Sequence, residues 1–172
     1  AGGSLVILEP GPLVGEELRT ALEHVDAALL TPSVLTTIDG SLTGVPVLVS
    51  TAEALSADLV ERFAPGRALF NAYGPTEATV VSCAAPLQPG EAVSIGLPLP
   101  GWDLAVVDTH GNPVEVGQTG ELVIGGVGLA RYLDADKDRT TYAPLPALGW
   151  KRAYRSGDHV RLAEAGVYFV GR

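Results

Sequence analysis

The stretch ALFNAYGPTE, residues 68–77, joins a short apolar run to a loop that carries several different polar groups. Residues 68–72 have the pattern of a buried strand, and the Gly-Pro pair that follows is a strong signal for the end of that strand. Within Asn71–Glu77 the loop then offers an amide, an aromatic ring, a hydroxyl and a carboxylate. The stretch therefore predicts a strand that delivers a polar, ligand-binding loop at its carboxyl end.

Upstream of this stretch, apolar strands alternate with amphipathic helices. Strands are expected at residues 5–8, 27–30, 45–49 and 68–72, and a helix at 14–25. Thr31 and Ser56 are suitable N-caps for two more helices, the first with proline as its first residue and the second running to Phe63. This alternation implies a parallel sheet with flanking helices, as in an αβα subdomain. In such sheets ligands bind beyond the carboxyl ends of the strands, which is where Asn71–Glu77 falls.

Beyond about residue 89 the helical periodicity stops, and Gly and Pro separate short apolar runs. Strands are expected at residues 103–108, 121–124, 158–162 and 167–170, joined by turns at 109–113 and 163–166. This pattern is typical of a small antiparallel, β-barrel-like subdomain. We therefore expect two subdomains, an αβ part at 1–88 and a β-barrel-like part at 89–172.

The composition excludes several classes of partner and site. The 172 residues are 47% hydrophobic and 18% charged, which indicates a globular chain. The net charge of −9 argues against nucleic acids and anionic membranes as partners, since both favour basic surfaces. One cysteine, Cys83, cannot form an internal disulfide framework or a cysteine-based metal site. The apolar runs are too short to cross a bilayer and no signal peptide is evident, so we expect a cytoplasmic protein.

The loop residues have the chemistry to hold a nucleotide with its metal ion. Tyr73 can stack on a flat base while the Asn71 amide bonds to the edge of that base. Thr76 can donate to a phosphate oxygen, and Glu77 is a hard oxygen ligand suited to Mg²⁺. From these residues alone, an ordinary Gly-Pro turn in which Glu77 merely caps the following segment is the favoured interpretation.

At Asn71–Glu77 the chain resembles the adenylation domains of nonribosomal peptide synthetases, within the adenylate-forming superfamily. Three later segments agree with that family in order, at residues 120–131, 154–158 and 169–172. They read GELVIGGVGLAR, YRSGD and FVGR. The last of these matches only the start of a family motif, and the first residue is not Met, so we expect an internal fragment of the large N-terminal part of such a domain.

The resemblance implies a role for each matching residue. Asn71, Tyr73 and Gly74 would bind the adenine side of ATP, Thr76 would contact the α-phosphate, and Glu77 would hold Mg²⁺. Thr76 and Glu77 would thus act in catalysis. Asp158 would accept hydrogen bonds from the ribose hydroxyls, Arg172 would approach the ribose, and Phe169 would border the nucleotide, where the family often has tyrosine. The family's amino-acid pocket maps by resemblance onto Leu29, Val49, Thr51, Ala72, Val80 and Val81.

These pocket positions are mostly apolar and include one hydroxyl, so we expect a substrate with an uncharged, hydrophobic side chain. A pocket of this kind discriminates poorly between side chains that differ by one methylene, so the amino acid stays open.

The chain departs from the family pattern in a few places. The family usually has Gly-Gly-Glu-Ala where this chain has Thr51-Ala-Glu-Ala54, and the larger side chains are expected to crowd the nucleotide. The family glycine between Arg131 and Tyr132 is missing, which leaves the local turn undefined. Ser156 stands for threonine and His159 for leucine, and both changes are tolerable.

The family reaction joins a carboxylate to ATP, giving an acyl-adenylate and pyrophosphate. The acyl group then passes to the phosphopantetheine thiol of a carrier-protein domain. Because the family's phosphate loop, amino-group aspartate and catalytic lysine match nothing in this sequence, we expect the isolated chain to be inactive. Two alternatives stay open: a fragment of an acyl-CoA or aryl-acid ligase of the same superfamily, and a non-catalytic binding or scaffold piece.

Overall fold

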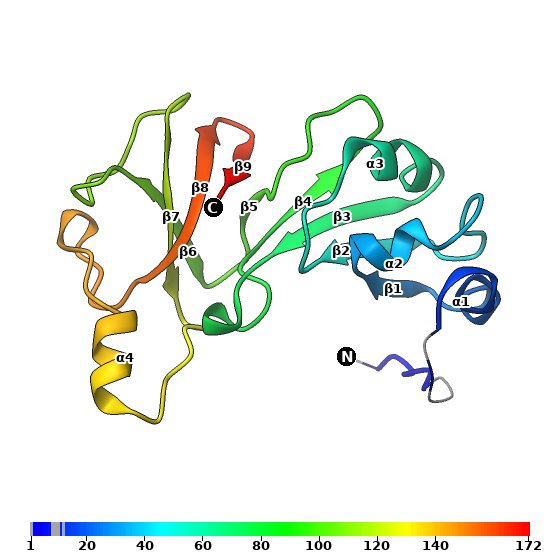
Figure 1. The fold of residues 1–172 in the computed structure, drawn as a ribbon, viewed down its shortest axis with the longest axis horizontal. Helices are drawn as coiled ribbons and strands as arrows, with labels where there is room; N and C mark the ends of the chain where they lie inside the picture. The colour runs from blue at the N-terminus through cyan, green and yellow to red at the C-terminus, as the bar shows by residue number, and fades with distance from the viewer. Residues whose placement is uncertain (1, 8–10, 12) are drawn as a thin grey trace. The chain divides into compact units, whose positions relative to one another are not determined.

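A computed structural model gives the structure of the chain and describes residues 2–7, 11 and 13–172. These residues divide into two compact units (Figure 1). The first unit comprises residues up to Phe70 together with Leu87–Ala92, and the second comprises Asn71–Pro86 and Val93–Arg172. The subdomain boundary expected near residue 88 stays a prediction.

The described strands form two sheets, one in the order β1-β2-β3-β4-β5 and one in the order β6-β7-β8-β9. The pair β1–β2 is parallel, β4–β5 is antiparallel, and all three pairs of the second sheet are antiparallel. This confirms the expected fold class, although the second sheet is open, with β6 and β9 at its edges, rather than a closed barrel. The helices are α1 (Gly15–Ala21), α2 (Pro32–Thr36), α3 (Ala57–Phe63) and α4 (Ala135–Thr141), with 3₁₀ turns η1 (Thr76–Ala78) and η2 (Pro146–Leu148). The strands are β1 (Ala27–Leu30), β2 (Val47–Thr51), β3 (Ala68–Tyr73), β4 (Cys83–Leu87), β5 (Leu97–Pro98), β6 (Trp102–Val107), β7 (Thr119–Gly126), β8 (Tyr154–Ala163) and β9 (Gly166–Gly171).

Both predicted N-caps in the first unit are present. The Thr31 hydroxyl accepts a hydrogen bond from the Val34 amide at the start of α2, and the Ser56 hydroxyl accepts one from the Leu59 amide at the start of α3. Each cap satisfies an amide that the first helical turn leaves without a backbone partner. Local sequence signals were therefore enough to place the start of these two helices.

Two elements of the first unit differ from expectation. Helix α1 is shorter than the predicted 14–25, because residues 24–26, His-Val-Asp, are weak helix formers. The strand expected at 45–49 begins only at Val47, since Pro46 has no amide hydrogen to donate to a neighbouring strand.

The strand expected at residues 5–8 is wrong over 5–7. There the backbone is irregular, and the Leu5 and Ile7 side chains are 87% and 85% exposed. Leu8 lies outside the described residues. An apolar run becomes a strand only when a neighbour pairs with it, and none pairs with residues 5–7 in the described part of the chain.

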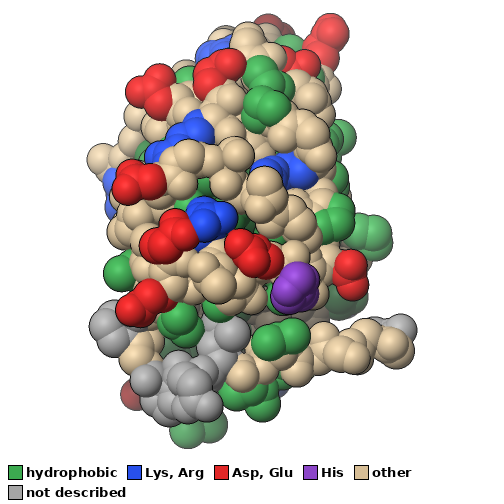
Figure 2. All heavy atoms as spheres, turned by 90° about the vertical axis from the view of Figure 1, so that its right-hand side faces the viewer, with side chains coloured by type: hydrophobic (Ala, Val, Ile, Leu, Met, Phe, Trp, Pro, Cys, Tyr) green, Lys and Arg blue, Asp and Glu red, His purple; other side chains and the backbone are tan. Residues whose placement is uncertain are grey.

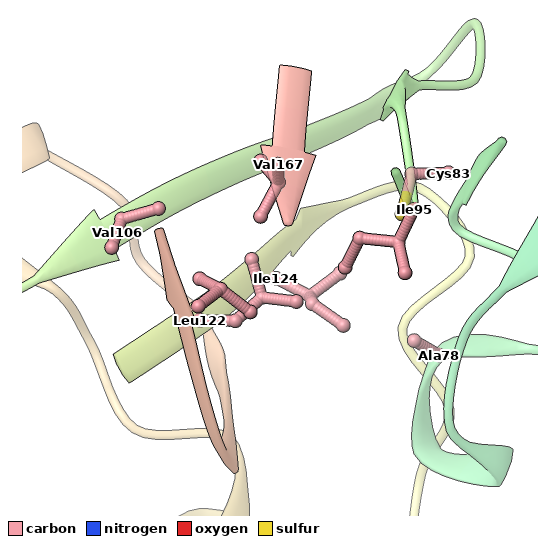
Figure 3. Packing of buried hydrophobic residues seen from close by; sticks show 8 residues of the cluster. Ala78, Cys83, Ile95, Val106, Leu122, Ile124 and Val167 are labelled. Atoms are coloured by element: carbon pink, nitrogen blue, oxygen red, sulfur yellow. The ribbon is translucent and has the colours of Figure 1, made fainter. Parts of the chain in front are cut away.

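The core of the second unit connects the loop after β3 to the antiparallel sheet. Leu122, Ile124 and Val160 of the sheet are fully buried and share one cluster with Cys83 and Ala78 (Figure 3). Ala78 follows Glu77 directly and is itself fully buried. Burial of this small side chain therefore fixes the backbone at the end of the polar loop.

The surface agrees with the acidic composition. On the face shown in Figure 2, Asp and Glu side chains are dispersed, with Lys or Arg between several of them. None of the helices in the described ranges combines the length and the apolar character needed to cross a membrane.

Candidate functional site

The loop of residues 74–82, which follows β3, is a tight backbone structure. A β-carbon on Gly74 would lie 2.7 Å from both the Ser82 nitrogen and the Val80 oxygen, so only glycine fits there. The Ser82 amide donates to the Tyr73 oxygen over 2.9 Å, and the Val80 amide donates to the Pro75 oxygen over 3.2 Å. The loop is thus folded back on the end of its own strand, and its shape depends on Gly74.

Two β-branched residues in this loop have left-handed backbone conformations. Thr79 has φ 48° and Val80 has φ 69°, a region that such side chains rarely adopt. The Thr79 hydroxyl donates to the Gly128 oxygen, and the Val81 amide donates to the Thr79 oxygen over 2.8 Å. Backbone strain that is held in place by surrounding contacts tends to occur at functional sites.

Asn71 is held by the segment that precedes β5. Its side chain is 5% exposed, and its Nδ2 donates to the Ser94 oxygen over 2.8 Å. The Ser94 hydroxyl in turn donates to the Val167 oxygen on β9 over 2.8 Å. These bonds fix the amide of Asn71 at the end of β3.

Tyr73, Asp158 and Arg172 meet around one carboxylate. The Tyr73 hydroxyl donates to Asp158 Oδ2, and Arg172 Nε lies 3.0 Å from Asp158 Oδ1. Burial first, and then the hydrogen bond to Asp158, raise the pKa of the Tyr73 phenol, so the phenol is a neutral donor at physiological pH. The Arg172 side chain is 73% exposed and the Asp158 side chain 10%, so Arg172 lies on the solvent side of this ion pair.

Asp158 is also positioned through its own backbone. Its amide donates to the Ser156 hydroxyl over 3.1 Å, and that hydroxyl donates to the Leu122 oxygen on β7 over 2.7 Å. The Ser156 hydroxyl thus links the Asp158 backbone to β7. Phe169 is paired with Val160 across β8 and β9, and its side chain is 43% exposed.

Glu77 lies among aromatic hydroxyls contributed by the chain between β7 and β8. The Tyr132 hydroxyl donates to Glu77 Oε1 over 2.7 Å, and the Tyr142 hydroxyl donates to the Glu77 backbone oxygen over 3.3 Å. The bond from Tyr132 is the largest cause that lowers the pKa of Glu77, and Lys137 adds a smaller effect. The same bond raises the pKa of Tyr132 to about 12. Glu77 is therefore an anion with one oxygen already oriented, while Thr76 beside it is exposed.

The six expected pocket residues are divided between the two units. Leu29 and Val49 are partners in the parallel pair β1–β2, and Thr51 follows two residues later on the same face of β2. Ala72 lies near the end of β3, while Val80 and Val81 lie in the loop of residues 74–82. Within the first unit, the structure thus brings Leu29, Val49 and Thr51 onto neighbouring strands.

Sequence reasoning missed the residues that hold the site in place. Side-chain hydrogen bonds from Tyr132 and Tyr154 both lower the pKa of Glu77. Tyr132 stands directly after the segment 120–131 and Tyr154 opens the segment 154–158, so their places in these segments were the available signal. The helix α4 between them was not expected, because none of its residues is buried and the sequence shows no apolar periodicity there. The Asp134 side chain, which caps α4 by accepting from the Asp136 and Lys137 amides, was the available signal.

The second unit thus combines two separate carboxylates with different surroundings. Asp158 is buried and held by Tyr73 and Arg172, whereas Glu77 is held by tyrosine hydroxyls within the strained loop of residues 74–82. In the described ranges, no three His, Cys, Asp or Glu side chains converge as a metal-binding group. This arrangement suits a ligand that has hydroxyl donors at one end and carries its own metal ion at the other.

Comparison with known proteins identifies a family. A family model described as AMP-binding enzyme matches residues 1–133. Novobiocin biosynthesis protein H of Streptomyces niveus is 41% identical over 180 residues, covering 100% of this chain and 30% of that protein. CymA, a probable non-canonical nonribosomal peptide synthetase of Salinispora arenicola, is 44% identical over 183 residues, covering 100% of this chain and 2% of that protein.

Solved structures agree with this assignment. Holo-PA1221, a nonribosomal peptide synthetase protein containing adenylation and PCP domains, superimposes with a TM-score of 0.84 at 34% identity, covering 94% of this chain and 31% of that one. Holo-AB3403, a four-domain nonribosomal peptide synthetase bound to AMP and glycine, gives a TM-score of 0.82 at 30% identity, covering 92% of this chain and 13% of that one. The chain thus spans less than a third of the length of each of these relatives. Because the family model matches most of the sequence, the chain belongs to the AMP-binding enzyme family, in which it is similar to the adenylation domains of nonribosomal peptide synthetases.

Proposed function

We propose that this chain is the part of an amino-acid-activating adenylation domain that binds the nucleotide. In the complete reaction, an oxygen of the amino-acid carboxylate attacks the α-phosphorus of ATP, and pyrophosphate leaves as the bond to the β-phosphate breaks. A carrier-domain phosphopantetheine thiol then attacks the acyl carbon, and AMP leaves. The observation that supports the proposal most strongly is the meeting of Tyr73, Asp158 and Arg172 at one buried carboxylate.

The residues at the ribose and adenine end of the site have surroundings that suit the roles proposed for them. Asp158 accepts hydrogen bonds from the ribose hydroxyls, since a buried carboxylate is a strong acceptor for a diol. Arg172 approaches the same sugar, and Phe169 borders it. Asn71, Tyr73 and Gly74 form the adenine side of the site, with the Tyr73 ring as the stacking surface.

Thr76 and Glu77 belong to the phosphate side. The exposed Thr76 hydroxyl donates to the α-phosphate, and Glu77 is the protein ligand for Mg²⁺. Mg²⁺ in nucleotide sites commonly takes one or two carboxylates together with the substrate phosphates, so a single oriented carboxylate fits. When bound with ATP, the ion supplies charge neutralisation on the phosphates.

The substrate and the carrier domain are proposed by analogy with the relatives. The mostly apolar set of Leu29, Val49, Thr51, Ala72, Val80 and Val81 favours an amino acid with an uncharged, hydrophobic side chain. AB3403 was solved with AMP and glycine, and PA1221 contains a PCP domain together with its adenylation domain. We therefore propose that the acceptor of the activated amino acid is a phosphopantetheine-bearing carrier domain.

The nucleotide part of the proposal can be tested on the 172-residue chain itself. Titration with AMP, followed by NMR, is expected to show weak, saturable binding with shifts around Asp158. 2′,3′-Dideoxy-AMP lacks both ribose hydroxyls and is expected to bind about tenfold more weakly, because it loses charge-assisted hydrogen bonds. Asp158→Asn should remove this difference in affinity between the two nucleotides. Asp103→Asn is the control: it makes the same change at an exposed aspartate on β6 and should keep the difference. Equal affinity of the wild-type chain for both nucleotides would show the ribose role to be wrong.

The same chain is expected to give no pyrophosphate exchange, since the family's phosphate loop and catalytic lysine match nothing in its sequence. Exchange above the background of an Asp158→Asn preparation would contradict this expectation.

A further inference from the structure

Glu77 is fixed at both its backbone and its side chain by one segment of the chain. The Ala130 amide donates to the Glu77 backbone oxygen over 2.9 Å, and the Tyr142 hydroxyl donates to the same oxygen over 3.3 Å. The Tyr132 hydroxyl donates to the carboxylate oxygen Oε1 over 2.7 Å. Residues 130–142 therefore hold the Glu77 backbone and one of its carboxylate oxygens, and the Tyr154 side chain on β8 is a further hydrogen-bond partner of the carboxylate.

Tyr132 is itself held in place, although the family glycine before it is missing. Its amide donates to Asp138 Oδ1 over 2.9 Å, and Asp138 pairs with Arg152 over 3.2 Å. Arg152 Nη2 also donates to the Ala130 oxygen over 3.2 Å, which closes a ring of contacts back to Glu77. The family glycine between Arg131 and Tyr132 is missing, and the Asp138 side chain instead fixes the turn at this point.

The Tyr132 ring has a second contact, with a cation. Lys137 Nζ lies 3.9 Å from the centre of the Tyr132 ring, a distance at which a cation and an aromatic face attract each other. The rings of Tyr132 and Tyr142 lie 6.0 Å apart in a tilted arrangement. These contacts limit the rotation of the Tyr132 ring and so keep its hydroxyl directed at Glu77.

We infer, on the basis of the function proposed above, that Tyr132 is a positioning residue for Mg²⁺-bound ATP, which acts by holding the Glu77 carboxylate in the orientation that receives the ion. A carboxylate that accepts a hydrogen bond on one oxygen presents the other to the metal, and it does not have to be reoriented when the ion arrives. Partners of this kind, which touch a ligand residue but not the metal, typically change metal affinity by about 10–100-fold when removed.

The experiment compares nucleotide binding with and without metal on the 172-residue chain. The probes are ATP with excess Mg²⁺, ATP with EDTA, and AMP with EDTA. In the wild-type chain, Mg²⁺ is expected to strengthen ATP binding. Tyr132→Phe should reduce this Mg²⁺-dependent gain about tenfold or more and leave AMP affinity unchanged. Tyr168→Phe removes a hydroxyl from a ring on β9 that packs against Arg161, and it should change neither quantity.

The Glu77→Gln variant distinguishes the proposed metal role of Glu77 from the positioning role of Tyr132. This variant should abolish the Mg²⁺-dependent gain, and adding Tyr132→Phe to it should have no further effect. A wild-type chain without a gain, or a Glu77→Gln chain that keeps it, would overturn the proposed metal role of Glu77 and the inference with it. If Glu77→Gln loses the gain but Tyr132→Phe keeps it, the inference alone is wrong. An equal loss of AMP and Mg²⁺-ATP affinity in Tyr132→Phe would assign the residue to folding instead and would also overturn the inference.

Discussion

The Tyr73 hydroxyl donates a hydrogen bond to the Asp158 carboxylate across a separation of 85 positions in the sequence. Tyr73 ends β3 and Asp158 lies within β8, so the bond joins the strand before the polar loop to the antiparallel sheet. It also couples the two nucleotide tasks proposed for these residues. A shift of the Tyr73 ring would move the donor that orients the Asp158 carboxylate.

Tyr73→Phe is expected to lower the free energy of unfolding by about 1.5 kcal/mol, because a largely buried carboxylate loses a hydrogen-bond donor. Arg172 still pairs with Asp158, which keeps the loss moderate. Urea unfolding followed by circular dichroism measures the change, with Tyr168→Phe as the matched control in the same unit. A loss in Tyr73→Phe no larger than that in the control would show that this bond does not stabilise the chain.

Ala52→Gly is expected to stabilise the chain. Ala52 has φ 71°, where a side chain costs about 1–2 kcal/mol, and it stands where the family usually has glycine. Glycine costs about 0.5–1 kcal/mol in unfolded-state entropy, so the net gain should be about 0.5–1 kcal/mol. Ala54→Gly is the control, since Ala54 is exposed and lies two residues away without a positive φ. If Ala52→Gly raises the thermal midpoint no more than Ala54→Gly does, the backbone conformation of Ala52 does not destabilise the chain.

Gly96→Ala should be one of the most damaging single substitutions in the second unit. Gly96 has φ 86°, and an added β-carbon would lie 1.9 Å from the Ala84 oxygen. Strain and overpacking together predict a loss of about 3–4 kcal/mol. Gly117→Ala has a similar φ of 95° with nothing within 4 Å, so it should lose only about 1–2 kcal/mol.

The Gly96→Ala substitution should also affect the site. The Ser94 hydroxyl accepts a hydrogen bond from the Gly96 amide, and the Ser94 oxygen holds the Asn71 side chain. We therefore expect the Nδ2 hydrogens of Asn71 to lose their protection from solvent exchange in Gly96→Ala and to keep it in Gly117→Ala. Equal protection and equal stability in the two variants would contradict the close contact at Gly96.

Features that depend on local sequence could be predicted. The caps at Thr31 and Ser56 and the strand of residues 68–73 follow from side-chain chemistry and apolar spacing within a few residues. Strand pairing is not local, which is why the apolar run at residues 5–7 was wrongly expected to be a strand.

The contacts within the site could not be predicted for the same reason. Tyr132 and Glu77 are 55 positions apart, and the partner of Asn71 is a backbone oxygen that no residue type reveals. The motifs indicated which groups would meet a nucleotide, but the groups that orient them come from folding. Helix α4 shows the limit clearly, since it has no buried residue and is recognisable only by its Asp134 cap.

Cys83 provides a prediction about alkaline pH. Burial raises the pKa of its thiol from 9.0 to about 12, because the fully buried sulfur disfavours the thiolate. The folded chain thus holds the thiol proton more strongly than the unfolded chain does. The resulting stabilisation is complete below pH 9 and is lost as the pH rises from 9 towards 12. In Cys83→Ala the packing change is the same at every pH, so the urea midpoint should fall less steeply between pH 8 and 11 than in the wild-type chain. Parallel slopes for the two proteins would show that Cys83 ionises as easily in the folded chain as in the unfolded one.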